Sequence, residues 1–213
     1  MGSNKVCIIA LKYLEDYWES TQKNIVDSGL PVIYVDRKGV GSMTKAFNSA
    51  IPELNIIFGD DLPEYLFFVT NNNFTKDTVD RLIESMDKTG FAAIHPSHDS
   101  DHPSHVNNKS EQVVETKYIE WTSPIVRTDL FLKYPLNENY HYWFFDLVWS
   151  YEIKKIGYKI GVDHGAFVDH RYLVKDLSDP ISQKRKQLRD SRNIIEHQIL
   201  NETYGSNWRL ILL

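Results

Sequence analysis

Tyr65-Leu66-Phe67-Phe68-Val69 is a continuous apolar run that stops abruptly at the polar triplet Asn71-Asn72-Asn73. Such a run is typical of a strand that is buried on both faces of a parallel sheet. Beyond the triplet, Thr75 precedes apolar residues at positions 79, 82, 83 and 86, which is the spacing of one helical face, and Gly90 follows. The sequence therefore predicts a buried strand, a polar strand end, and a helix that is capped by Thr75 and ends at Gly90.

The same alternation of strands and helices extends in both directions along the chain. Residues 6–11 and 31–35 are earlier apolar runs with a helical stretch between them, and residues 91–94 form a later one. The second half predicts a helix over 145–156 that ends at Gly157, short strands over 158–162 and 166–168, and a charged helix over 181–203. This order predicts an α/β fold in which a mostly parallel, Rossmann-like central sheet is flanked by helices.

A single domain is expected over residues 1–213, because no linker interrupts the chain. Residues 95–112 are interpreted as a flexible polar loop, since their His, Pro, Ser, Asp and Asn residues offer little to bury. Residues 180–213 are expected to form a C-terminal helical tail.

The composition excludes several classes of protein. The chain carries 24 Lys and Arg against 29 Asp and Glu, a net charge of −5, with 42% hydrophobic residues. This acidic, globular composition argues against disorder and against a nucleic-acid partner. Cys7 is the single cysteine, so no disulfide can form within the chain, and no apolar run approaches the length of a transmembrane segment. We therefore expect a cytoplasmic protein.

The residues that follow the strands are the first candidates for a site, because ligands of such sheets bind beyond the carboxyl ends of the strands. Asp36 follows the second strand, where a carboxylate accepts hydrogen bonds from a ribose or a base, although a turn-capping role is equally open. The amides of Asn71, Asn72 and Asn73 offer oxygens to a weakly held cation or hydrogen bonds to a sugar or diphosphate, or else they only form a turn.

Four histidines recur in the polar stretch, at positions 95, 98, 102 and 105. Pro96 and Pro103 prevent a helix from presenting them on one face. A zinc site is one interpretation of this cluster, and a solvated loop with titratable side chains is the one that we favour.

Asp146 lies near the start of the helix at 145–156, behind the aromatic run Tyr140-His141-Tyr142-Trp143-Phe144-Phe145. A carboxylate there can act as a general base while the aromatic rings stack on a sugar or a base. The alternative is an aspartate that compensates the helix dipole, and composition alone favours that alternative.

Several patches of the sequence resemble the family 2 glycosyltransferases of the GT-A fold, particularly the rhamnosyltransferase-like members. Residues 32–36 look like the strand whose terminal Asp contacts the base, residues 45–51 like the segment with an Asn before a small residue, and residues 65–82 like the strand that delivers the D-x-D motif. The strongest patch joins Asp146, Gly157-Tyr158 and His170, whose intervals of eleven and thirteen residues resemble those of the family.

The resemblance implies an inverting transfer of a sugar from a nucleoside-diphosphate sugar to a hydroxyl group of a glycan or other acceptor, with Asp146 as the catalytic base. It implies a divalent cation, Mn²⁺ or Mg²⁺, for which Asn71 and Asn73 are alternative partners of His170. The implied donor site consists of Asp36, Lys45, Asn48, Asn71, Asn72, Asn73 and Arg171.

The chain also departs from the family pattern. Asn71, Asn72 and Asn73 stand where the family has metal-binding aspartates, and Phe145 stands where an acidic residue usually precedes the base. A non-catalytic module that binds a nucleotide sugar or a glycan is therefore the alternative function. A nucleotidyltransferase ranks last, because no basic, glycine-rich signature follows the first strand. The sugar-transfer hypothesis requires positions 36, 71–73, 146 and 170 to converge on one cleft at the edge of the sheet.

Overall fold

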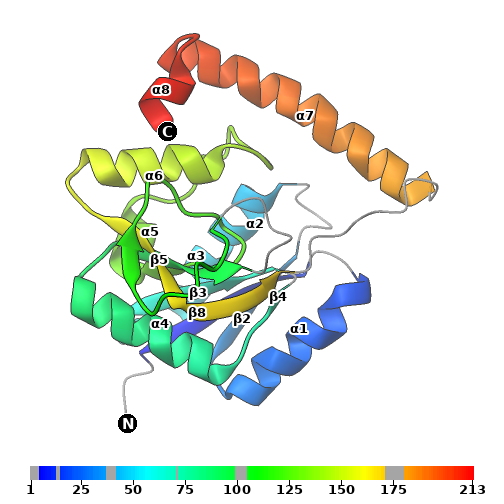
Figure 1. The fold of residues 1–213 in the computed structure, drawn as a ribbon. Helices are drawn as coiled ribbons and strands as arrows, with labels where there is room; N and C mark the ends of the chain where they lie inside the picture. The colour runs from blue at the N-terminus through cyan, green and yellow to red at the C-terminus, as the bar shows by residue number, and fades with distance from the viewer. Residues whose placement is uncertain (1–4, 13–14, 37–41, 71, 99–104, 171–179) are drawn as a thin grey trace.

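The computed structural model describes residues 5–12, 15–36, 42–70, 72–98, 105–170 and 180–213. Strands and helices alternate along most of this length (Figure 1). The strands are β1 (Val6–Lys12), β2 (Val32–Asp36), β3 (Tyr65–Val69), β4 (Asn72–Asn73), β5 (Ala93–His98), β6 (Val113–Glu115), β7 (Ile125–Arg127) and β8 (Ile160–His170). The helices are α1 (Glu15–Ser28), α2 (Met43–Asn48), α3 (Ala50–Phe58), α4 (Lys76–Thr89), α5 (Thr128–Lys133), α6 (Phe145–Lys155), α7 (Pro180–Tyr204) and α8 (Trp208–Leu212).

The strands are joined in the order β2-β1-β3-β7-β5-β8-β4, and β6 also pairs with β8. Strand β1 runs parallel to both β2 and β3, and β5 runs parallel to β8. The short strands β4, β6 and β7 run antiparallel to their neighbours. The predicted α/β fold, with a mostly parallel central sheet flanked by helices, is confirmed.

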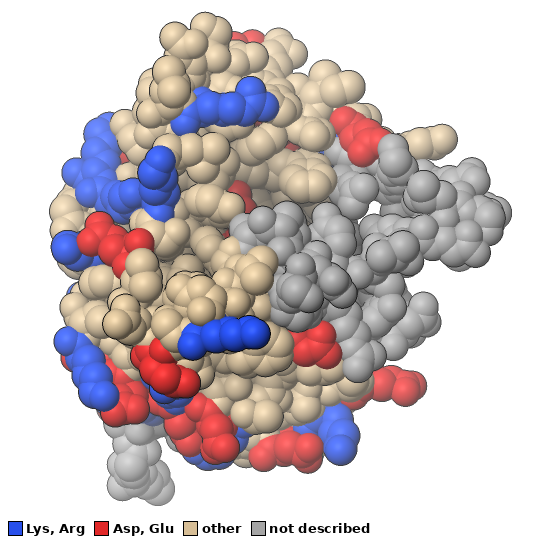
Figure 2. Space-filling view, viewed as in Figure 1, with Lys and Arg blue, Asp and Glu red and all other residues tan. Residues whose placement is uncertain are grey.

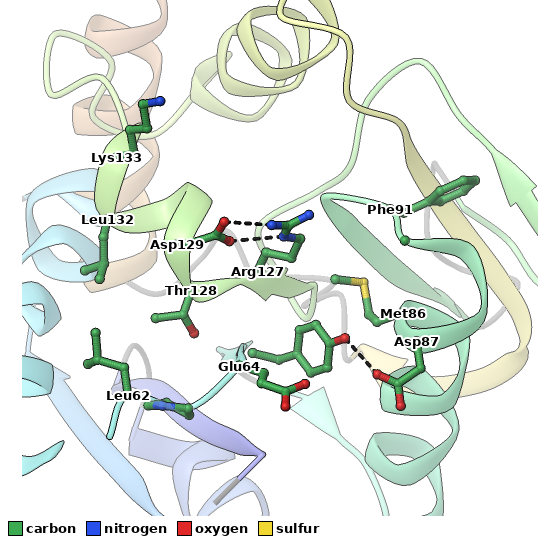
Figure 3. A pocket seen from close by; sticks show the side chains of 13 residues that line it. Leu62, Glu64, Met86, Asp87, Phe91, Arg127, Thr128, Asp129, Leu132 and Lys133 are labelled. Carbon is green, nitrogen blue, oxygen red and sulfur yellow. Dashed lines mark hydrogen bonds and ion pairs between the residues drawn. The ribbon is translucent and has the colours of Figure 1, made fainter. Parts of the chain in front are cut away.

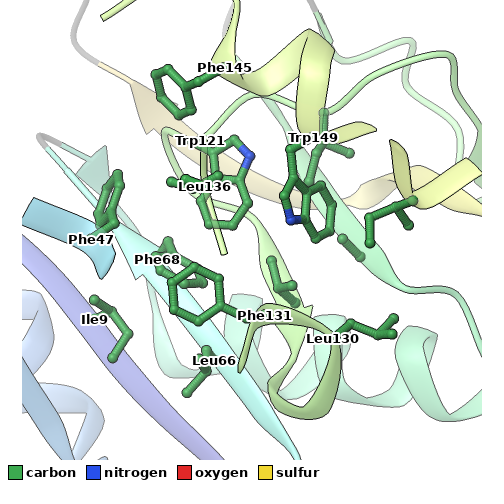
Figure 4. Packing of buried hydrophobic residues seen from close by; sticks show 14 of the residues in the cluster. Ile9, Phe47, Leu66, Phe68, Trp121, Leu130, Phe131, Leu136, Phe145 and Trp149 are labelled. Carbon is green, nitrogen blue, oxygen red and sulfur yellow. The ribbon is translucent and has the colours of Figure 1, made fainter. Parts of the chain in front are cut away.

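Successive side chains of a strand point to opposite sides of the sheet, so alternate apolar residues belong to two cores on its opposite faces. Ile9 and Phe68 belong to the core that includes α2, α3, α5 and α6, whereas Ile8 and Phe67 belong to the core that includes α1 and α4. Figure 4 shows the first core, in which Trp121 packs edge-on against Phe68 with ring centroids 4.6 Å apart. Aromatic side chains thus fill the space between the sheet and α6.

The helix predicted over 181–203 is confirmed as α7, and the short helix α8 follows it. Leu200 of α7 and Trp208 of α8 are buried in the core that also contains α6. Figure 1 shows both helices beyond α6, on the side of the sheet away from α4. Among the helices in the described ranges, none is long and apolar enough to cross a lipid bilayer.

The helix predicted after the asparagine triplet is α4, and its ends form as expected. The Oγ1 of Thr75 accepts a 3.2 Å hydrogen bond from the backbone N–H of Thr78, and Gly90 ends the helix with φ +64°. On the face seen in Figure 2, acidic and basic side chains are mixed rather than segregated. Helix α4 carries two exposed ion pairs, Lys76 with Asp80 and Lys88 with Glu84.

Strand β5 runs farther than its apolar residues predict, so the polar loop does not begin at His95. The strand continues to His98, and His95 and His98 are both fully buried. The prediction of a solvated loop is wrong for these two histidines, because β5 keeps pairing with β8 as far as His98. Position 102 lies outside the described residues.

Strand β8 is continuous where the sequence predicts two short strands. Its pairing with β5 shifts register between Pro96 and Ser97, opposite a bulge. The buried carboxylate of Asp163 holds this bulge, since it accepts a 2.8 Å hydrogen bond from the backbone N–H of Gly165 and pairs with Arg81 of α4 at 3.2 Å. The sequence does not predict β6 or β7, because three residues each are too few to show a period.

Candidate functional site

The carboxyl ends of β1, β2 and β3 lie at one edge of the sheet, where the sequence predicts a ligand. Lys12 and the exposed Asp36 are register partners at the ends of β1 and β2. Beyond β3, the backbone N–H of Thr70 and the Nδ2 of Asn72 both donate to the carbonyl oxygen of Thr122, at 3.2 and 2.6 Å. The segment that leads into β7 therefore borders the strand-end asparagines.

The asparagines also meet the end of β8. Asn72 is the register partner of His170, and Asn73 is the partner of Asp169. The Nδ2 of Asn73 donates a 3.3 Å hydrogen bond to the Oδ2 of Asp169. The structure thus brings 72–73 and 170 together, as the sugar-transfer hypothesis requires. Position 71 and the side chain of His170 lie outside the described part of the chain.

Asp146 lies in the first turn of α6, where protein surrounds its carboxyl group although the residue keeps some exposure. Its Oδ1 accepts a 2.9 Å hydrogen bond from the backbone N–H of Leu147. Burial, together with the negative charges of Glu120 and Glu196, raises the pKa of the Asp146 carboxyl to about 7, against the lowering effect of backbone hydrogen bonds. A carboxyl group of this kind changes protonation near neutral pH, as a general base does.

Glu120 lies near enough to Asp146 for its negative charge to raise the pKa of the Asp146 carboxyl. It lies two residues before Thr122, whose carbonyl oxygen binds Asn72. Its Oε2 is 3.9 Å from the Nε2 of the buried His98, and His95 places its own Nε2 3.0 Å from the Oγ1 of Thr122. The two buried histidines therefore pack against the 120–122 segment.

No group of three His, Cys, Asp or Glu side chains in the described ranges is arranged to hold a metal ion. The zinc interpretation of the histidine cluster gains no support from His95, His98 and His105, whose rings pack against each other with centroids 4.5 to 6.5 Å apart.

The segment before α6 contacts α2, which carries Lys45. The backbone N–H of Met43 donates to the carbonyl oxygen of His141 at 2.9 Å. Burial lowers the pKa of His141, and the positive charges of Arg192 and Lys45 lower it further, so each of these cations lies near His141. Lys45 therefore belongs to the neighbourhood of the 141–146 segment.

Asn48, at the end of α2, uses its amide on the protein itself. Its Nδ2 donates to the carbonyl oxygen of Leu136 at 2.9 Å and to Glu138 at 3.1 Å, and its Oδ1 accepts from the N–H of Leu136. The remaining predicted donor residue, Arg171, lies outside the described residues, as does the 37–41 segment that follows Asp36.

A pocket of about 850 Å³ lies at the opposite edge of the sheet, where β3 begins and β7 ends (Figure 3). Its charged groups are largely engaged with one another. The hydroxyl of Tyr65 donates to Asp87 at 2.8 Å, and the guanidinium of Arg127 holds Asp129 with two hydrogen bonds. We place the candidate site at the carboxyl edge, because the strand-end amides lie there and Glu120, whose charge acts on Asp146, lies two residues before the Thr122 that binds Asn72.

Sequence reasoning missed four contributors to this site, namely Glu120, Thr122, Asp169 and Glu196. Asp169 precedes the predicted ligand His170, and this adjacency is the one signal that points to it. The other three reach the site through tertiary contacts between distant segments, which no local pattern encodes.

No family model matches this sequence, and no curated protein matches it. The solved structure described as GalNAc-T7 with UDP, GalNAc and Mn²⁺ matches with a TM-score of 0.59 and 8% identity, over 82% of this chain and 45% of that chain. S. aureus TarS matches in complex with UDP-GlcNAc, with a TM-score of 0.56 and 14% identity over 82% of this chain and 61% of that chain. The TarS complex with UDP matches with a TM-score of 0.55 and 14% identity, over 78% of this chain and 60% of that chain.

This chain therefore spans about half of GalNAc-T7 and about three fifths of the TarS chain. At such low identities, the likeness concerns the arrangement of strands and helices. By that arrangement, the chain has the GT-A fold of these glycosyltransferase neighbours.

Proposed function

We propose that this chain is a glycosyltransferase that moves a sugar from a nucleoside-diphosphate sugar to a hydroxyl group of a glycan or other acceptor, with inversion at the sugar carbon. The neighbours GalNAc-T7 and TarS, whose structures hold UDP or UDP-GlcNAc, support a nucleotide sugar as the donor. Family 2, with its rhamnosyltransferase-like members, remains our assignment from the sequence patches.

The observation that carries the proposal is the placement of Asp146. It is a largely enclosed carboxyl group whose pKa is raised to about 7 by burial and by the charge of Glu120, and Glu120 lies two residues before Thr122, whose carbonyl oxygen binds Asn72. In an inverting transfer, the attacking hydroxyl loses its proton as the new bond to the sugar forms. Asp146 in its ionised form accepts that proton.

The donor binds along the carboxyl edge in this proposal. Asp36 contacts the base at the end of β2, and Lys45 and Arg171 stabilise the negative charge of the departing diphosphate. Asn48 and Asn72 act through the segments that they hold, 136–138 and 122, because their amides already bind those segments.

A divalent cation fits this edge only as a weakly held ion. Asn73 and Asp169 are hydrogen-bonded neighbours and offer one carboxylate and amide oxygens, the ligand type that Mg²⁺ and Mn²⁺ prefer. Asn73, or Asn71 by the alternative alignment, would hold the ion together with Asp169 and His170. The bound cation would neutralise charge on the diphosphate. GalNAc-T7, whose structure includes Mn²⁺, is consistent with the use of a divalent cation.

The first test is calorimetric titration with UDP, dTDP and GDP, each with and without Mn²⁺. Turnover is then measured as release of the nucleoside diphosphate in the presence of an acceptor, for the unaltered chain and for Asp146→Asn. Asp77→Asn is the matched control, because Asp77 is an exposed aspartate in the first turn of α4. Loss of turnover by about 10²-fold or more in Asp146→Asn alone supports the base role. Full activity in that variant removes Asp146 from it.

A non-catalytic binding module is the second candidate, and a specific observation favours it. The strand that should deliver the metal-binding aspartates ends in asparagines, and the amide of Asn72 is fully buried. A panel of nucleotide sugars separates the two functions. A transferase releases the diphosphate slowly even without an acceptor, whereas a pure binding module releases none.

A further inference from the structure

The C-terminal helix α7 binds the segment that leads into α6 through a fully buried carboxylate. The Oε1 of Glu196 accepts hydrogen bonds from the backbone N–H groups of His141 at 2.7 Å and Tyr142 at 3.2 Å, and its Oε2 accepts one from Trp143 at 2.8 Å. Hydrogen bonds to an ionised acceptor are stronger than neutral ones. One side chain thus anchors three consecutive backbone donors.

The next residue of α7 continues this contact. The ring of His197 packs against Phe144 with centroids 4.6 Å apart, and Phe144 adopts a left-handed backbone conformation with φ +62°. Such a φ is unusual for a bulky residue and persists only where the surroundings impose it. Phe144 is also the N-cap residue of α6, two positions before Asp146.

Helix α2 binds the opposite side of the same segment. The N–H of Met43 donates to the carbonyl oxygen of His141, and the Oγ1 of Thr44 donates to that of Tyr140, both at 2.9 Å. The carbonyl groups therefore bind α2 while the N–H groups bind Glu196. The direction in which the first turn of α6 points depends on both contacts.

We propose that Glu196 is a positioning residue for the transfer reaction: its carboxylate fixes the 141–144 turn and thereby the place of Asp146. This inference rests on the proposed function, in which Asp146 is the base. Glu196 itself touches neither donor nor acceptor in this proposal. It acts through the backbone of the turn, and the alignment of a base with its substrate tolerates little displacement.

The charge of Glu196 has a second effect. Asp146 faces two acidic groups, Glu120 from the segment before β7 and Glu196 from α7, and both raise its pKa. The pKa of Glu196 is itself raised, because burial outweighs the lowering effect of its three backbone hydrogen bonds and of Arg192 on the same helix. Glu196 in turn raises the pKa of Tyr140. Removal of the Glu196 charge is therefore expected to lower the pKa of Asp146.

The test compares Glu196→Gln with Glu202→Gln, an exposed glutamate of the same helix. Glutamine keeps one acceptor oxygen but presents an NH₂ group to a backbone donor. We expect kcat to fall by about 10- to 100-fold in Glu196→Gln, with the KM for the donor nearly unchanged. The acid limb of its pH profile moves to lower pH. Glu202→Gln matches the unaltered chain in both measurements, and Glu196→Asp, which keeps the charge, keeps the acid limb in place.

Two measurements need no substrate. The pKa of Asp146, read from carboxyl carbon shifts by NMR, should fall in Glu196→Gln, and the amide protons of 141–143 should exchange faster than in the unaltered chain. If neither Glu196→Gln nor Glu196→Asp folds, the unaltered chain still gives a test. Rapid exchange of the amide protons of 141–143 in that chain overturns the inference. An unchanged kcat and an unmoved acid limb in folded Glu196→Gln also overturn it. Failure of the proposed function is distinguishable, because then Asp146→Asn turns over normally or no nucleotide sugar is consumed.

Discussion

Glu120 lies near enough to Asp146 for its negative charge to raise the pKa of the Asp146 carboxyl, and only burial raises that pKa more. Two carboxylates that approach each other in a partly desolvated place favour the protonated form of one of them. Here Asp146 is the group whose pKa is raised, to about 7. The pair therefore gives the candidate base a titration near neutral pH.

The first prediction concerns the pH dependence of turnover. Because the base must be ionised, kcat should rise with pH and level off above the pKa of Asp146, which is about 7. Below that value, the rate should fall about tenfold for each pH unit. A rate that is independent of pH between 5 and 8 would contradict this assignment.

The second prediction concerns Glu120, the acidic neighbour of Asp146. Glu120→Gln removes the charge that raises the pKa of Asp146 more than Glu196 does, so the acid limb should move to lower pH, and farther than in Glu196→Gln. Glu115→Gln is the control, since Glu115 is an exposed residue of β6 that pairs with Lys159. If the acid limb moves equally in Glu120→Gln and Glu196→Gln, or moves in neither, Glu120 does not have the larger effect on the pKa of Asp146.

The third prediction concerns stability. The pKa of Asp146 is about 7 in the folded chain, and that of an unfolded aspartate is about 3.9, so the folded state holds this proton more tightly. The group stabilises the fold fully below about pH 4, and this stabilisation is lost as the pH rises to about 7. Asp146→Asn should thus be more stable than the unaltered chain by about 2–4 kcal/mol at pH 8, with a smaller gain at pH 5. Urea unfolding at pH 5 and pH 8 measures the difference in the free energy of unfolding. Equal stabilities of the two chains at pH 8 would show that the pKa of Asp146 is not raised.

The sequence predicts the parts of the fold that depend on local periodicity. The alternation of Ile8 and Ile9, or of Phe67 and Phe68, between the two cores follows from apolar runs that are visible in the sequence. The buried His95 and His98 are not predictable in this way. Their polar side chains suggest a loop, and only the pairing of β5 with β8, which joins distant segments, buries them.

The candidate site is predictable only where one residue marks it. The resemblance in spacing singles out Asp146 and His170, and the strand end singles out the triplet Asn71, Asn72 and Asn73. Glu120 and Glu196 act on Asp146 from segments about 26 and 50 residues away, where each is one acidic residue among many. Tertiary packing selects these two from the other glutamates, and a single sequence does not show that packing.

The fourth prediction tests the bulge of β8. Arg81→Ala leaves the buried carboxylate of Asp163 without its ion-pair partner, which should destabilise the fold by about 3 kcal/mol. Lys76→Ala, on the exposed face of the same helix, should cost less than about 0.5 kcal/mol, because its pair with Asp80 is solvated. Chemical denaturation of both variants measures the difference. Similar losses in the two would mean that Asp163 does not depend on Arg81.

The fifth prediction concerns the cation. Asn73→Asp would place a second carboxylate beside Asp169, whose Oδ2 accepts a hydrogen bond from Asn73 in the unaltered chain. Without a cation, the two like charges should repel each other and lower the free energy of unfolding. With Mn²⁺, the pair supplies the charge that an amide lacks, so we expect Mn²⁺ to bind at least about tenfold more tightly than to the unaltered chain. Asn108→Asp, an exposed change in the segment before β6, controls for net charge. Calorimetric titration measures the affinity of both variants for Mn²⁺. If the affinity increases no more in Asn73→Asp than in Asn108→Asp, the cation binds elsewhere.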